Sequence, residues 1–153
     1  MNFERSNMSS FKGSYTYAVD EKGRVSLPAK MRKYVSPEAN ETFVLTRGFE
    51  KCLFVYPIDE WNKLEETLRN LSNYDADHRL FIRSMLELAS ESVLDGQSRL
   101  SLPQELREYA GITGEVRIIG TLDKIELWNP QIYEEYRSSH AETYESIAAR
   151  VMK

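Results

Sequence analysis

One nine-residue motif occurs twice in the chain, and this duplication constrains the fold more than any other feature. The copies occupy residues 20–28 and 95–103, separated by 75 positions. Their Asp, Arg, Ser, Leu and Pro residues coincide, and the likeness continues from residues 31–34 to residues 106–109. A solenoid needs three or more repeats to bury a core, so two copies predict one duplicated domain.

Each copy is predicted to form a β-hairpin followed by a short helix. Asp20 can bond the backbone two residues on, and Gly23 accepts a positive φ, so residues 20–23 are expected to form a tight turn. Pro28 then suits the first turn of a helix. The predicted strands, rich in aromatic and β-branched residues, are 15–19, 24–27, 42–46, 52–56, 116–119 and 125–128. The predicted helices are 28–34, 58–71, 76–89, 103–110 and one that begins at residues 129–130.

These elements predict an α+β protein with a defined order of segments. A chain of 153 residues can bury a sizeable core. The expected segments are a flexible N-terminal tail at residues 1–10, a first repeat at 11–57, a helical hairpin at 58–89, a second repeat at 90–129 and a C-terminal helix at 130–153.

Charge is distributed unevenly along the chain. The net charge is −4, yet residues 1–35 hold seven Lys or Arg against three Asp or Glu. The basic residues around the first motif copy are Lys12, Lys22, Arg24, Lys30, Arg32 and Lys33. A local basic patch suits phosphate binding, although the charge by itself favours a merely solvated surface. No apolar run reaches the ~20 residues of a membrane span, and the single Cys52 excludes an internal disulfide and fits a reducing compartment.

Residues with catalytic potential are few. The two histidines, His78 and His140, have no partner at metal-ligand spacing. Ser26 and Ser101 recur in the motif without a nearby histidine, which favours a polar residue on the outer face of a strand over a nucleophile. We therefore expect no enzyme activity, no metal, no cofactor and no small-molecule substrate.

The repeated arginines, Arg24 and Arg99, remain as the principal candidates for function. Each follows a tight turn, where a guanidinium can present planar donors to phosphate or guanine. For the first copy, Lys22, Lys30 and Arg32 would add positive charge. The alternative is structural: Asp20 and Asp95 would each lock a turn through an ion pair with the arginine four residues on.

The motifs resemble those of the MraZ family of bacterial transcriptional regulators. The resemblance rests on Phe-Lys-Gly-Ser-Tyr at residues 11–15, the Asp-x-Lys-Gly-Arg-x-Ser-x-Pro motif at 20–28, and Leu-Phe-Val-Tyr-Pro-Ile-Asp-Glu-Trp at 53–61. The second copy adds Leu-Asp-x-x-x-Arg-Leu at 94–100 and Leu-Arg-Glu-Tyr-Ala-Gly at 106–111.

The resemblance implies a duplicated swapped-hairpin β-barrel of the AbrB/SpoVT class, in which the two motif copies act as a pseudo-dimer. It also implies a cytoplasmic, nucleoid-associated protein that binds double-stranded DNA at short direct repeats in the promoter of the division and cell-wall gene cluster. A homo-oligomer in a closed ring is expected. The family's motif arginines fall on Arg24 and Arg99, and its motif aspartates fall on Asp20 and Asp95. Gly23, with these aspartates, is expected to have a structural role in the turn.

The second copy departs from this pattern. Ser98 stands where the first copy has Gly23, so the position of positive φ is expected to move to Gly96 and to re-aim Arg99. Gln97 replaces Lys22, which predicts unequal DNA binding with the first copy dominant.

The alternative function is a protein-interaction or assembly module in which the motif arginines are structural.

Overall fold

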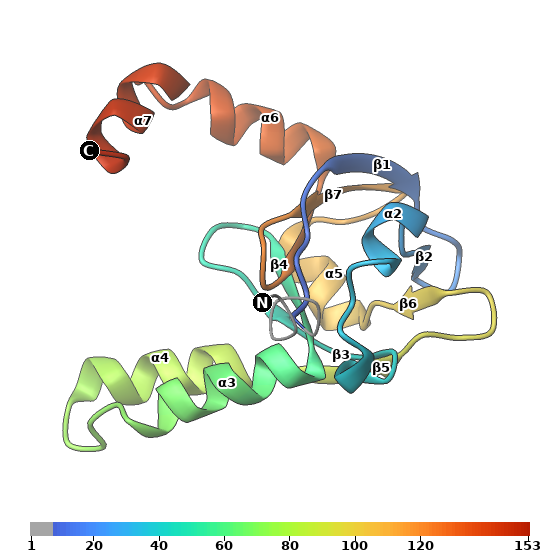
Figure 1. Cartoon of the computed structure of the whole chain (residues 1–153), viewed down its shortest axis with the longest axis horizontal. Helices are drawn as coiled ribbons and strands as arrows, with labels where there is room; N and C mark the ends of the chain where they lie inside the picture. Colours follow the sequence, from blue (N-terminus) through green and yellow to red (C-terminus); the bar gives the residue numbers. More distant parts are fainter. Residues whose placement is uncertain (1–7) are drawn as a thin grey trace, which may run out of the picture.

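Eight antiparallel strands form the centre of the computed structural model, which describes residues 8–153 (Figure 1). The strands of the first copy are β1 (Ser14–Ala18), β2 (Arg24–Ser26), β3 (Thr42–Arg47) and β4 (Leu53–Pro57). Those of the second copy are β5 (Ser90–Val93), β6 (Arg99–Ser101), β7 (Glu115–Gly120) and β8 (Ile125–Trp128). The larger sheet has the order β1-β7-β8-β4-β3-β5, and β2 pairs with β6 in a second sheet.

The strand pairing exchanges elements between the two copies. β1 of the first copy pairs with β7 of the second, and β5 of the second pairs with β3 of the first. Equivalent strands of the two copies also pair with each other: β4 with β8 at the centre of the larger sheet, and β2 with β6 in the second sheet. Only the hairpins β3-β4 and β7-β8 stay within one copy. The predicted α+β class and the duplicated swapped-hairpin arrangement are therefore confirmed, with β1 and β5 at the edges of the larger sheet.

Hydrophobic residues cover both faces of the central strands. Along β3, Phe43 and Leu45 face one core cluster while Val44 faces another, as the two-residue period of a strand requires. The first cluster fills the space between the large sheet, the β2-β6 pair and the short helices, and includes Val25, Leu100 and Leu106. The second cluster packs helices on the opposite face. Each copy is thus buried against the other rather than folding alone.

Six α-helices and one 3-10 turn cover these strands within the described residues. Their bounds are α2 Ala29–Arg32, η1 Pro37–Ala39, α3 Ile58–Arg69, α4 Ala76–Leu86, α5 Gln104–Ala110, α6 Pro130–Ser138 and α7 Tyr144–Val151. Asp75 caps α4 by accepting hydrogen bonds from the backbone of Asp77 and His78, as the sequence predicts. Gly111 ends α5 with φ +68°.

The prediction of a single C-terminal helix is wrong. The helix that begins at Pro130 ends at Ser138, and α7 starts anew after Thr143. Thr143 has extended backbone angles, and its side chain accepts a hydrogen bond from the Ser146 backbone, so a local N-cap competes with helix continuation. The apolar period of this segment persists across the break, which is why periodicity alone missed it.

Two helical arms extend from the same side of the strands, one formed by α3 and α4 and the other by α6 and α7 (Figure 1). The β1-β2 and β5-β6 turns lie at the opposite end of the molecule. No helix in the described part of the chain is long and apolar enough to cross a membrane.

The tail predicted for residues 1–10 falls largely outside the described residues, which exclude residues 1–7. Ser9 and Ser10 belong to the folded body. Ser9 is buried and its hydroxyl accepts a hydrogen bond from the Ser36 backbone at 2.9 Å, while the Ser10 backbone donates to the Tyr34 carbonyl at 3.1 Å.

Candidate nucleic-acid interface

The first motif turn is held together by the carboxylate of Asp20. One oxygen, Oδ1, accepts hydrogen bonds from the backbone of Lys22 at 3.0 Å and of Arg24 at 2.8 Å. The Gly23 backbone donates to the Asp20 carbonyl at 2.9 Å, and Gly23 has φ +78°. The chain therefore reverses within four residues and delivers Arg24 at the start of β2.

The second motif turn repeats this geometry despite its different sequence. Asp95 Oδ1 accepts from the backbone of Gln97 at 2.9 Å and of Arg99 at 3.0 Å. The expected move of positive φ to Gly96 is wrong, because Ser98 itself adopts φ +58° and Gly96 has no positive φ. The side-chain bonds of Asp95 and the Ser98 backbone bond to the Asp95 carbonyl, at 2.9 Å, hold the turn in the same shape.

Each motif arginine is paired with the aspartate of its own turn. Nε of Arg24 lies 2.8 Å from Oδ2 of Asp20, and Nε of Arg99 lies 2.8 Å from Oδ2 of Asp95. The arginine side chains are still 29% and 25% exposed. Within residues 8–153 the two terminal nitrogens of Arg24 have no hydrogen-bond partner, so the ion pair orients the guanidinium without using all of its donors.

These contacts lower the pKa of both aspartates. For Asp20 the main cause is the hydrogen bond from the Arg24 backbone, and the Arg24 guanidinium adds to it. For Asp95 burial raises the pKa, but the backbone bonds from Arg99 and Gln97 and the Arg99 side chain together outweigh it. Both carboxylates are therefore ionised at neutral pH and hold their arginines in place.

Pairing of β2 with β6 places the two turns side by side. Nη1 of Arg99 lies 3.8 Å from Oδ2 of Asp20 in the other turn. The Leu102 backbone donates to the Gly23 carbonyl at 2.8 Å, and the Leu27 backbone donates to the Ser98 carbonyl at 3.0 Å. The two copies thus form one continuous surface with two arginines.

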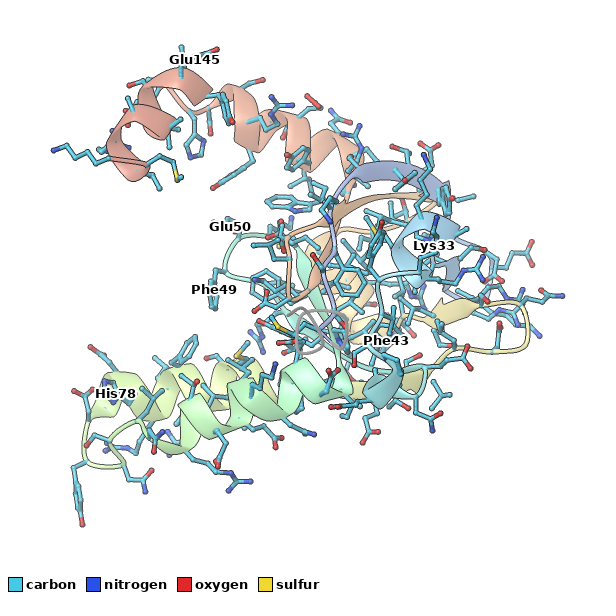
Figure 2. The ribbon with its side chains drawn as sticks, viewed as in Figure 1. Lys33, Phe43, Phe49, Glu50, His78 and Glu145 are labelled. Carbon is cyan, nitrogen blue, oxygen red and sulfur yellow. The ribbon has the colours of Figure 1, made fainter. Side chains whose placement is uncertain are left out.

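The other predicted basic residues all come from the first copy, but one of them contacts the second turn. Lys22 is exposed at the first turn, and Lys30 is exposed on α2. Arg32, also on α2, contacts the second turn rather than the first, because Nη1 donates to the Ser98 hydroxyl at 3.2 Å. Figure 2 labels its neighbour Lys33, which lies well away from His78 and Glu145 on the helical arms.

Arg107 on α5 is a residue of this surface that the sequence analysis missed. It is equivalent to Arg32 by the repeat, and its side chain lies against Gly23 of the first turn. The alignment of residues 31–34 with residues 106–109 already contained this signal. The sequence did not show that α2 of the first copy contacts the second turn and that α5 of the second copy contacts the first turn.

Two side chains of reactive type, His78 and Cys52, have structural surroundings. Nδ1 of His78 accepts a hydrogen bond from the Ser72 backbone at 2.9 Å, which closes the loop between α3 and α4. Cys52 is fully buried, and burial raises the pKa of its thiol to about 12. In the described part of the chain no cluster of three or more His, Cys, Asp or Glu side chains is arranged to hold a metal ion.

Comparison with known proteins gives one consistent result. Two consecutive segments, residues 10–84 and 85–153, each match the family model described as "MraZ protein, putative antitoxin-like". A protein from Halothermothrix orenii named transcriptional regulator MraZ is 45% identical over 139 residues, covering 91% of this chain and 94% of that protein. Proteins of the same name from Natranaerobius thermophilus and Syntrophomonas wolfei are 41% and 42% identical, each over 93% of this chain and 96% of the relative.

Proposed function

The chain belongs to the MraZ family, which is a family of transcriptional regulators and not of enzymes, and from this premise we propose that it is a sequence-specific DNA-binding transcriptional regulator. The observation that carries the proposal is the pair of arginine turns held side by side by β2 and β6. Two guanidiniums fixed on one surface can engage neighbouring phosphates or guanines of a duplex.

The proposed DNA contacts centre on Arg24 and Arg99, with Lys22, Lys30 and Arg32 supplying further positive charge. Each arginine is oriented by its aspartate through Nε. This leaves both terminal nitrogens of Arg24 to bind DNA, and Nη2 of Arg99, whose Nη1 already lies 3.8 Å from Asp20. The structural interpretation of the ion pair and the functional one are thus compatible, since the aspartate lowers the entropy cost of fixing a long side chain before it meets DNA.

The proposed target is a set of short direct repeats in the promoter of the division and cell-wall gene cluster, and the proposed location is the cytoplasm, on the nucleoid. We also propose that several copies of the chain join in a closed ring, which would let weak contacts to several repeats act together. The helical arms support this assembly, because they lie at the end of the molecule away from the arginine turns and carry exposed apolar residues.

A salt titration of DNA binding tests the proposal. The probes are a duplex from upstream of the gene and a scrambled duplex of the same composition. Wild type should bind the first selectively, and Arg24→Ala combined with Arg99→Ala should abolish selectivity and reduce the salt slope by about 0.9 for each lost phosphate contact. Arg69→Ala, an exposed arginine on α3, is the matched control and should bind like wild type.

A second function, an assembly module with purely structural arginines, predicts a different result. The observation that favours it is the direct Asp–Arg ion pair in both turns. Under that function the double substitution lowers the melting temperature, and wild type binds both duplexes weakly and equally. Selective wild-type binding with a folded, non-binding double variant would eliminate the assembly-only function.

A further inference from the structure

The glycine at position 23 is not explained by backbone conformation alone. Gly23 and Ser98 occupy equivalent positions, and their φ angles are +78° and +58°. Both turns have the same backbone bond to their aspartate, at 2.9 Å in each case. Because a serine sustains this geometry in the second copy, the turn itself tolerates a side chain, and the surroundings of Gly23 decide how well one would fit.

The guanidinium of Arg107 occupies the space in which a side chain at position 23 would begin. A Cβ at position 23 would lie 2.7 Å from Nε, 2.8 Å from Cζ and 3.0 Å from Nη2 of Arg107, and the first two distances are shorter than real Cβ atoms show, so Arg107 would have to move. Arg107 is held in this position because its Nε donates to the Leu102 carbonyl at 2.9 Å. Its planar group therefore packs directly on the bare backbone of Gly23.

The second turn has the equivalent arginine but a different contact. Arg32 is anchored in the same way, with Nε donating to the Leu27 carbonyl at 3.3 Å. Here Nη1 donates to the Ser98 hydroxyl at 3.2 Å. Arg107 packs on the first turn because Gly23 has no side chain there. Arg32 instead donates a hydrogen bond to the second turn, because Ser98 has a hydroxyl.

Both contacts run between copies. Arg107 belongs to the second copy and contacts the turn of the first, whereas Arg32 belongs to the first copy and contacts the turn of the second. We propose that Arg107 and Arg32 are positioning residues, each bracing the arginine turn of the opposite copy, so that Arg24 and Arg99 meet DNA as one coupled unit. This inference rests on the proposed DNA-binding function and adds two positioning residues with a specific partner each.

A stability cycle tests the bracing without DNA. Gly23→Ala should lower the melting temperature of wild type through both the positive φ and the clash, and should lower it distinctly less in an Arg107→Ala background, where only the positive φ opposes it. The matched control combines Gly23→Ala with Arg32→Ala, which should give additive shifts because Arg32 does not contact Gly23. Additive shifts with Arg107→Ala as well would overturn the inference.

A DNA-binding series separates positioning from direct contact. Arg107→Ala should weaken selective binding by about tenfold, the range of coupling between residues in contact, with the salt slope unchanged. Arg107→Lys should be nearly as weak, because an ammonium keeps the charge but not the planar group and its Nε donor. Recovery by lysine, or a slope reduced by about 0.9 as for a lost phosphate contact, would overturn the positioning role.

The two proposals fail separately. If wild type shows no selective binding, the proposed function is contradicted and the positioning role is overturned with it, while the stability cycle still decides whether the bracing exists. If wild type binds selectively and Arg107→Ala binds equally well, the proposed function stands and the positioning role is overturned.

Discussion

The guanidinium of Arg99 lies 3.8 Å from the carboxylate of Asp20, although the two residues belong to different copies of the motif. Asp20 is already paired with Arg24 at 2.8 Å. One carboxylate therefore faces both motif arginines, and it lessens the repulsion between two cations held on one surface.

Replacing Arg24 by lysine should not preserve binding. A lysine ammonium is a single point charge that cannot both pair with Asp20 through one nitrogen and present further donors in a fixed plane. We expect Arg24→Lys to weaken selective DNA binding by about 1–3 kcal/mol, the cost of losing a bidentate arginine, with a normal circular dichroism spectrum. Fluorescence anisotropy against the upstream duplex measures this, with Arg69→Lys as the control. Wild-type affinity in Arg24→Lys would show that charge alone is sufficient.

Acid should destabilise wild type more than a variant that lacks the two turn carboxylates. The pKa values of Asp20 and Asp95 are lowered in the folded chain from the ordinary value of 3.8. Groups of this kind stabilise the fold fully above the ordinary value and lose that contribution as the pH falls through the lowered folded value. The melting temperature of wild type should thus fall more steeply in this acidic window than that of Asp20→Asn/Asp95→Asn.

Thermal melts of both proteins from neutral to acidic pH provide the measurement. Parallel curves across the acidic window would mean that the two carboxylates do not stabilise the folded state.

The centre of the large sheet should be sensitive to loss of volume. Leu127 on β8 is 1% exposed and belongs to the main core cluster. Leu127→Ala should reduce the free energy of unfolding by about 2–5 kcal/mol, from lost apolar burial and the cavity left behind. Leu80→Ala, at a site 61% exposed on α4, should change it by less than about 0.5 kcal/mol. Equilibrium urea unfolding distinguishes the two, and equal effects would contradict the assignment of the core.

Local sequence signals predicted most of the elements and the shape of the first turn. The 75-residue repeat indicated a duplicated domain, and strand-forming stretches located six of the eight strands within one or two positions. For β5 and β6 the sequence predicted no bounds of their own, only a second hairpin by analogy with the first copy. Asp20 was expected to bond the backbone two residues on, and its bond to Lys22 confirms that expectation. These features depend on neighbours in sequence, which is why the sequence alone was sufficient.

Contacts between the copies could not be predicted in the same way. The placement of Arg32 on Ser98 and of Arg107 on Gly23 depends on the pairing of β2 with β6, which joins residues far apart in the chain. The conformation of Ser98 depends on the same environment, because a serine seldom adopts positive φ unless its surroundings hold it there. The repeat shows that Arg32 and Arg107 are equivalent, but it does not show which residues they contact.

The last helix provides a test of assembly. No residue of α7 is buried within the chain, and Tyr144 and Val151 are 82% and 69% exposed. Such a short amphipathic helix gains little stability by itself, so its apolar face is expected to be covered by another copy in the proposed ring. Deleting residues 141–153 should leave the melting temperature of the fold nearly unchanged and reduce the mass of the assembly in light scattering. Tyr144→Ser/Val151→Ser should reproduce the loss of mass without shortening the chain. An unchanged mass in both variants would place the contacts of the ring elsewhere on the protein.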